Sequence, residues 1–248
     1  MRFSSEGPSL QLYLSEPGQR PGSVPANVAV LARFLEQEIG EPVVLVGNSM
    51  GGMISILLTG ERPELVSGLV LLDPAIPGPR RALDPLVALM FALYAVPLVG
   101  ERVMRRNRTR QSATARVHQT LRLVGVDPSA LPADLIDRSV SLVEERQDVE
   151  GMDRAFLAAA RSLLRVLVDP RRYRRAMRGI AVPVLLVQGD QDRLVPVAAA
   201  REIARQHPAW TYLELPGVGH VPMLQVPERV ADEVLAWLTV TSAVDATA

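Results

Sequence analysis

The sequence predicts an α/β fold with a mostly parallel sheet, helices on both faces and a helical lid inserted between two strands. Apolar runs typical of buried strands alternate with helical patterns up to residue 74 and again from residue 180. The stretch between them has helical periodicity and no strand signal. We therefore expect residues 1–74 and 180–248 to form an α/β core and residues 75–179 to form a cap.

The first core segment is predicted to run helix, strand, helix, strand. Ser23 and Pro25 mark a helix start, and apolar residues recur at helical spacing until Gly40 ends the element. An apolar strand follows from Pro42, then a helix over about 51–59, then a second buried strand, LVSGLVLL, at 65–72. A strand, a helix and a strand in succession predict parallel pairing.

The cap is predicted to contain helices at 85–96, 112–124, 132–145, 152–168 and 171–177. The uncharged run at 85–100 contains Pro97 and is shorter than the roughly 18 residues that a membrane-spanning helix needs. We interpret it as a lid helix, with contact to a membrane surface as the less favoured alternative. The α/β pattern then resumes with a strand at 182–187, a helix at 196–206, a strand at 211–215 and a helix at 227–238.

Composition excludes several kinds of chemistry. The 248 residues include no cysteine, and all 27 basic residues are arginine, so thiolate nucleophiles, Schiff-base lysines and a lysine-containing phosphate loop are ruled out. The net charge is zero, which predicts no nucleic-acid partner. Residues 75–181 nevertheless hold 19 arginines against 11 acidic residues, so the cap is basic and the core acidic. With no signal peptide visible, we expect a cytoplasmic protein.

A G-x-S-x-G pattern at Gly47–Gly51 is the strongest functional signal in the chain. It lies where the first predicted strand meets a helix, a corner that exposes a serine hydroxyl on a strained turn. We expect Ser49 to be a nucleophile, with Gly47 and Gly51 required because side chains there would clash across the turn.

A serine hydroxyl needs a base, and the chain has three histidines. His118 lies inside a predicted cap helix, and His207 precedes a proline at a helix end. His220 lies in a glycine-rich loop directly after the predicted strand at 211–215, where catalytic groups are commonly carried. We therefore expect His220 to be the base.

The acid that orients the histidine has three candidates from the residues alone. Asp192 and Asp190 both follow the strand at 182–187, and spacing does not separate them. Asp73 follows the strand at 65–72 and has an alternative interpretation as a turn former. We rank Asp192 first, Asp190 second and Asp73 third.

The chain resembles the α/β-hydrolase superfamily, in its lidded branch of esterases and C–C bond hydrolases. The resemblance rests on G-N-S-M-G-G at 47–52, G-D-Q-D-R-L-V-P at 189–196 and G-V-G-H at 217–220. It implies the α/β-hydrolase fold, the set Ser49, Asp192 and His220, and the Met50 backbone N–H as an oxyanion-hole donor. It implies no cofactor and no metal.

The N-terminal part departs from the family pattern. Only 48 residues precede Ser49, and the chain contains no His-Gly dipeptide, the usual mark of the loop that supplies a second oxyanion donor. We therefore expect the early strands to be missing, which leaves one edge of the sheet uncovered.

The favoured function is a serine hydrolase that forms an acyl-enzyme on a small hydrophobic ester or related carbonyl substrate. The cap residues Met90, Phe91, Leu93 and Tyr94 are expected near the site and indicate a hydrophobic acyl or aryl group. One alternative is a C–C bond hydrolase, although that group generally has tryptophan where this chain has Val221. The other is a truncated, non-catalytic remnant.

Overall fold

The core of the protein is a four-stranded parallel sheet, seen in a computed structural model that describes residues 22–78, 84–147, 149 and 151–245. Its strands, in spatial order, are β1 (Val43–Asn48), β2 (Val66–Leu72), β3 (Val184–Gly189) and β4 (Thr211–Leu215). Every neighbouring pair is parallel, and Asn48 lies opposite Leu72 at the carboxyl end of the sheet. The predicted strands and their parallel pairing are confirmed. The loops that leave these strand ends therefore gather along one edge.

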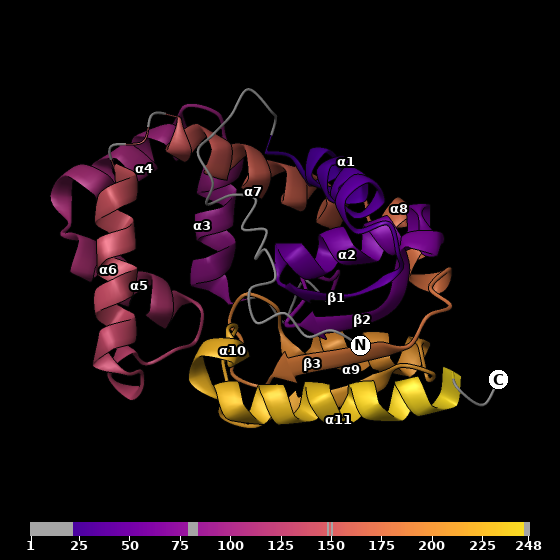
Figure 1. The fold of residues 1–248 in the computed structure, drawn as a ribbon. Helices are drawn as coiled ribbons and strands as arrows, with labels where there is room; N and C mark the ends of the chain where they lie inside the picture. The colour runs from indigo at the N-terminus through magenta and orange to yellow at the C-terminus, as the bar shows by residue number, and fades with distance from the viewer. Residues whose placement is uncertain (1–21, 79–83, 148, 150, 246–248) are drawn as a thin grey trace.

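Helices cover both faces of this sheet, as predicted (Figure 1). One buried apolar cluster joins the sheet to α1 (Val24–Phe34), α2 (Met50–Glu61), α8 (Arg171–Arg178) and α9 (Val197–Gln206). A second cluster joins the opposite face to α11 (Pro227–Asp245). The Ser23 hydroxyl caps α1 by accepting from the Ala26 N–H, and a short π-helical turn continues α1 to Gly40, whose positive φ ends it.

The helices between β2 and α8 form a layer that extends away from the sheet (Figure 1). They are α3 (Pro85–Ala95), α4 (Val99–Arg110), α5 (Ala113–Leu123), α6 (Ala133–Gln147) and α7 (Met152–Val168). Short 3₁₀ turns at Pro63–Leu65 and Pro128–Ala130 and the single-turn α10 (Pro222–Gln225) complete the described elements.

Helix α4 was missed by the sequence analysis because it has no apolar stripe. Only Gly100 is buried in it, and most of its other side chains are polar. A tertiary ion pair holds it instead: the Arg161 guanidinium of α7 donates to both carboxylate oxygens of Glu101, at 2.9 and 3.0 Å, and to the carbonyl of Tyr94 at 2.9 Å. Such a long-range contact leaves no periodic signal in the sequence.

Helix α8 packs tightly against α2. Tyr173 and Met177 are buried in the same cluster as the sheet, and a Cβ added at Gly60 of α2 would lie 2.6 Å from the Cβ of Ala176. The division of the chain at residues 74 and 180 stays a prediction.

Strand β1 lies at the edge of the described sheet, and its Val46 side chain is 59% exposed. The prediction about missing early strands falls on residues 1–21, which lie outside the described residues.

Among the described helices, none is by itself long and apolar enough to cross a bilayer. Helices α3 and α4 together meet that length and composition, but the pair bends by 112° at the break between them.

Candidate active site

Ser49 occupies the sharp corner between β1 and α2 that the sequence predicted. Its φ of 53° and ψ of −118° are unusual for a residue with a side chain and carry a strain of roughly 1–3 kcal/mol. The corner is held from both sides: the Ser49 N–H donates to the Leu72 carbonyl at 3.2 Å, and the Ala75 N–H donates to the Ser49 carbonyl at 2.9 Å. The strain is thus sustained by hydrogen bonds to β2 and its following loop.

Two glycines, Gly47 and Gly52, make this corner possible, whereas the sequence predicted Gly47 and Gly51. A Cβ at Gly47 would lie 2.7 Å from backbone atoms of Gly51 and Gly52, as expected. At Gly51 itself no atom would lie within 4 Å of a Cβ, so the predicted clash at that position is wrong. The second tight position is Gly52, where a Cβ would lie 2.7 Å from the Cβ of Pro74. The first turn of α2 passes the loop after β2 at Gly52, whereas Gly51 faces open space.

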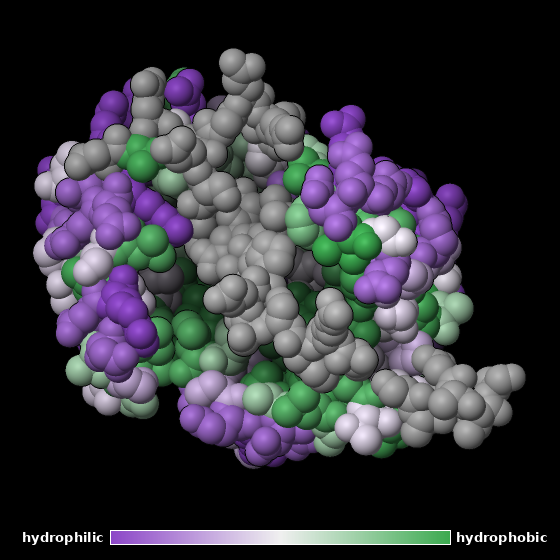
Figure 2. All heavy atoms as spheres, in the orientation of Figure 1, coloured by the Kyte–Doolittle hydropathy of each residue, from purple (hydrophilic) through white to green (hydrophobic). Residues whose placement is uncertain are grey.

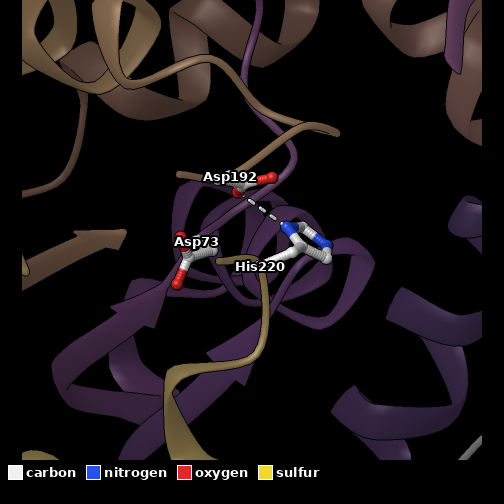
Figure 3. Close-up of side chains that lie close together, drawn as sticks. All are labelled: Asp73, Asp192 and His220. Carbon is white, nitrogen blue, oxygen red and sulfur yellow. Dashed lines mark hydrogen bonds and ion pairs between the residues drawn. The ribbon is translucent and has the colours of Figure 1, made fainter. Parts of the chain in front are cut away.

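His220 and Asp192 form a buried hydrogen-bonded pair (Figure 3). The His220 Nδ1 lies 2.7 Å from the Asp192 Oδ2, and the two residues are 4% and 7% exposed. The other carboxylate oxygen, Oδ1, accepts from the backbone N–H groups of Leu194 and Val195, at 2.7 and 2.9 Å. These bonds fix both the carboxylate and the imidazole in orientation. The His220 Nε2 is buried and has no hydrogen-bond partner among the described residues.

The remaining candidates from the sequence lie elsewhere. The Asp190 carboxylate accepts from the Gly217 N–H at 2.7 Å and so holds the loop that leads to His220, not the imidazole. His207 stacks on Trp210 with ring centroids 4.4 Å apart, and burial lowers its pKa. His118 lies on α5 in the cap.

Asp73 is a second buried carboxyl in the site, and Figure 3 shows it beside Asp192 and His220. It is fully buried, and its Oδ1 accepts from the Gly189 N–H at 2.8 Å and from the Gln188 side chain at 2.9 Å. Burial, and then the nearby charge of Asp192, raise the pKa of Asp73 to about 9. Asp73 therefore carries a proton at neutral pH.

The Gln188 amide connects the two carboxyl groups. Its Nε2 lies 2.9 Å from the Asp73 Oδ1, 3.0 Å from the Asp192 Oδ2 and 3.0 Å from the Val195 carbonyl. Sequence reasoning missed Gln188, although a lone polar residue inside an otherwise apolar strand is a signal that could have found it.

Asn48 links the nucleophile corner to the histidine loop. Its side-chain amide donates to the Leu72 carbonyl and to the His220 carbonyl, both at 3.0 Å. The residue before Ser49 therefore ties β1 to β2 and to the loop that carries the base. The sequence analysis assigned no role to this side chain.

By spacing, Asp73, Asp192 and His220 could also be considered for a metal, since one ligand atom of each lies within 4.8 Å of the others. However, the 2.7 Å separation of the His220 Nδ1 and the Asp192 Oδ2 is a hydrogen-bond distance. Two ligands of one zinc ion, each about 2.0–2.2 Å from it in a tetrahedral shell, lie farther apart than this. The geometry fits an acid–base pair better.

Ser49 lines a cavity of about 610 Å³ that Leu194 and Val195 also line, whereas neither His220 nor Asp192 is among its lining residues. No hydrogen bond joins the Ser49 hydroxyl to His220 within the described part of the chain. Most of the lining is apolar and comes from the loop after β2, from α3, from α7 and from the loop after β3, including Ile76, Val87, Ala88, Phe91, Ala92, Ala95, Leu163, Leu167 and Leu194. Figure 2 shows hydrophobic residues in the recess between cap and core, with hydrophilic residues over the outer faces of the cap helices.

The expected cap residues are only partly correct. Phe91 lines the cavity, but Met90, Leu93 and Tyr94 are not among its lining residues. Tyr94 instead packs edge-on against Phe156 of α7, with ring centroids 5.7 Å apart. The turn of α3 explains this, because its lining residues form one arc of the helix and Met90, Leu93 and Tyr94 lie outside that arc. The lining residues of α3 are Val87, Ala88, Phe91, Ala92 and Ala95.

Met50 is the first residue of α2 and directly follows Ser49. An N–H in the first turn of a helix has no acceptor within that helix, and the helix dipole favours negative charge there. The Met50 N–H thus lies at a helix N-terminus, and its role as an oxyanion donor stays a prediction.

Comparisons with known proteins point to one family. A model of the alpha/beta hydrolase family matches residues 7–233. Monoglyceride lipase of Mus musculus is 29% identical over 204 residues, which are 80% of this chain and 58% of that protein. Lipase LipV of Mycobacterium tuberculosis is 42% identical over 69 residues, 28% of this chain and 26% of that protein. The chain thus spans less than two thirds of the length of these relatives.

Among solved structures, 2-hydroxy-6-oxo-6-phenylhexa-2,4-dienoate hydrolase from a Rhodococcus species superposes with a TM-score of 0.67 at 18% identity. The match covers 90% of this chain and 74% of that one. At this identity the likeness concerns the fold alone.

Proposed function

We propose a serine-hydrolase function for this chain, which belongs to the alpha/beta hydrolase family. The observation that carries the proposal is the buried His220–Asp192 pair, with Nδ1 and Oδ2 2.7 Å apart, whose histidine lies on a loop that Asn48 ties to the Ser49 corner. Ser49 itself lines an apolar cavity. The reaction is acyl transfer from an ester or related carbonyl compound to Ser49, followed by hydrolysis of the acyl-enzyme.

Each residue has one role in this mechanism. The Ser49 hydroxyl attacks the carbonyl carbon while the His220 Nε2 accepts its proton. Asp192 holds the imidazole by Nδ1 and stabilises the imidazolium, which then protonates the leaving alcohol. The Met50 N–H donates to the oxyanion of the tetrahedral intermediate. Water repeats the sequence on the acyl-enzyme and releases the acid.

The substrate class follows from the cavity. Its mostly apolar lining favours an alkyl or aryl group on the substrate, because burying apolar surface stabilises the complex by about 25 cal/mol per Å². The named activities of the relatives, lipase and monoglyceride lipase, support a hydrophobic ester.

Hydrolysis of p-nitrophenyl esters of increasing chain length tests the function. We expect turnover by the unmodified protein and a loss on the order of 10⁴-fold or more in kcat for Ser49→Ala, because the nucleophile is removed. Ser141→Ala, on an exposed face of α6, is the matched control and should retain full activity.

Two other outcomes would change the assignment. Faster turnover of a vinylogous diketone than of any ester would favour the C–C bond hydrolase, a reaction with which the Asn48–Gly52 pattern is also compatible. A folded protein whose residual ester turnover is the same with and without Ser49 would indicate a non-catalytic remnant.

A further inference from the structure

The cavity beside Ser49 contains one charged side chain among its described lining residues, that of Arg174. Arg174 lies on α8, and its neighbours in the lining are Pro170 and Val168 at the end of α7. Val168 is 71% exposed and Arg174 is also exposed, so this end of the cavity is its open mouth. The cavity therefore has a nucleophile and a cation, with apolar walls making up most of the remaining surface.

The Arg174 guanidinium makes no hydrogen bond or ion pair with any residue that the structure describes, whereas two of the other four arginines of the same helix do. Arg172 pairs with Glu61 at 2.7 Å and Arg171 lies 3.7 Å from Asp169. No acidic residue occurs among the described lining residues of the cavity. An anionic ligand in this cavity could therefore pair with Arg174 without first displacing an acidic residue of the protein.

The position of Arg174 is well defined by its helix. Its neighbours Tyr173 and Met177 are 0% and 1% exposed, and Ala176 packs directly on Gly60 of α2. Because α8 cannot shift without disturbing the core, the backbone of Arg174 stays beside the cavity. The guanidinium itself loses side-chain entropy when it pairs with a ligand.

We propose that Arg174 binds a carboxylate or phosphate group at the far end of the substrate, so that the preferred substrates are anionic amphiphilic esters. In such a complex the ester carbonyl lies at Ser49, the hydrocarbon part fills the apolar cavity, and the anion pairs with the guanidinium fork. This inference rests on the proposed function, of which it specifies the substrate class.

Matched ester pairs test this. We would compare p-nitrophenyl ω-carboxyalkanoates and ω-phosphonoalkanoates with neutral p-nitrophenyl alkanoates of the same length, over a series of chain lengths. The unmodified protein should prefer the anionic ester at one or two lengths, and Arg174→Gln should lower the anionic-to-neutral ratio of kcat/KM about 10-fold or more, mainly through KM. The two kinds of anion show whether carboxylate or phosphate is recognised.

Arg171→Gln is the matched control, because Arg171 lies on the same helix, is 92% exposed and does not line the cavity. An unchanged ratio in Arg174→Gln, or an equal fall in Arg171→Gln, would overturn the proposal, since the second result reflects net charge alone. Arg174→Lys should keep part of the preference.

Binding separates this proposal from the proposed function. In a Ser49→Ala background, calorimetry can compare monomethyl esters of dicarboxylic acids with methyl esters of fatty acids, with and without Arg174→Gln. A loss of anion preference on adding Arg174→Gln supports the anion site even if no ester is turned over. If the proteins with and without Arg174→Gln prefer the anionic ligand equally, the anion site is refuted, even if neutral esters are hydrolysed through Ser49.

Discussion

At the scale of single residues, the site contains two buried carboxyl groups with different partners. Asp192 accepts hydrogen bonds from two backbone N–H groups and lies 2.7 Å from an imidazole nitrogen. Asp73 is fully buried, and burial, followed by the nearby charge of Asp192, raises its pKa and favours its neutral form. One group can orient a base while the other serves as a neutral part of the packing.

The protonated state of Asp73 predicts a pH-dependent stability. The unfolded chain loses this proton near pH 3.8, whereas the folded protein keeps it up to about pH 9. Between these values the folded state binds more protons, so rising pH favours unfolding. Above pH 3.8, folding requires the Asp73 carboxyl to take up a proton, and this lowers the stability of the folded state. Asp73→Asn has no such group, so we expect the free energy of unfolding of this variant to exceed that of the unmodified protein by roughly a few kcal/mol at pH 8.

Denaturant titrations between pH 4 and pH 9 measure this. The advantage of Asp73→Asn should shrink as the pH falls and nearly vanish near pH 4, where the unfolded chain begins to bind this proton as well. Asp232→Asn, at an exposed position of α11, should show no such trend. A difference that does not vary with pH would mean that Asp73 is not protonated in the folded protein.

Replacing Asp192 tests the orientation of His220. Asp192→Asn keeps the size of the side chain but cannot hold the imidazole in the required tautomer, so kcat should fall on the order of 10³- to 10⁴-fold. Asp190→Asn is the matched control, because its carboxylate bonds to the Gly217 N–H and not to the ring. Similar losses in both variants, in steady-state assays of folded protein, would argue against the assigned acid.

At the scale of elements, the turn between α5 and the following 3₁₀ segment holds the loop of the base. The His220 N–H donates to the Val124 carbonyl at 2.9 Å, and a Cβ at Gly219 would lie 2.6 Å from the Gly125 oxygen. The two backbones meet without side chains between them. A segment of the cap therefore contributes to where the imidazole lies.

Gly125→Ala should disturb this contact. Gly125 has a φ of +83°, and a Cβ there would lie 2.3 Å from the Gln191 carbonyl oxygen, so the cap must move away from the acid and base loops. We expect a loss of stability of about 1–3 kcal/mol, seen as a lower melting temperature, together with at least a 10-fold lower kcat.

A second glycine separates the two causes. Gly40 has a φ of +71° but no atom within 4 Å of its Cβ position. Gly40→Ala should therefore lower the stability only by the backbone strain at this positive φ, and kcat should be unchanged. Equal kcat losses in the two variants would show that contact between the cap and the His220 loop does not matter for activity.

At the scale of the whole molecule, cap and core meet at the loops that carry the acid and the base. Besides the contact at His220, Arg193 next to Asp192 pairs with Asp84 at the start of α3, with Nε and Oδ2 2.8 Å apart. The Arg193 side chain also donates to the Arg122 carbonyl at 3.1 Å. Movement of the cap would thus change both the shape of the cavity and the support of the His220–Asp192 pair.

Much of this arrangement could be predicted from the sequence, because it depends on short-range patterns. Apolar runs bounded by turn residues located the four strands, and the glycine at 47 marked the corner at Ser49. The positions of Asp192 and His220 directly after strands predicted that they would meet, since parallel strands end at the same edge. Patterns of this kind indicate the local secondary structure and which side chains are buried.

Only the tertiary structure decided which groups lie around that pair. The Gln188 bridge, the raised pKa of Asp73, the Asn48 link to His220 and the place of Arg174 in the cavity lining all depend on contacts between distant segments. Helix α4 is likewise tied to α7 by the Arg161–Glu101 pair, a contact that its own sequence does not show. The sequence by itself determined the elements, the family pattern and the candidate nucleophile, acid and base. Charge states and neighbours had to come from the fold, because they depend on burial and on distances that no local pattern encodes.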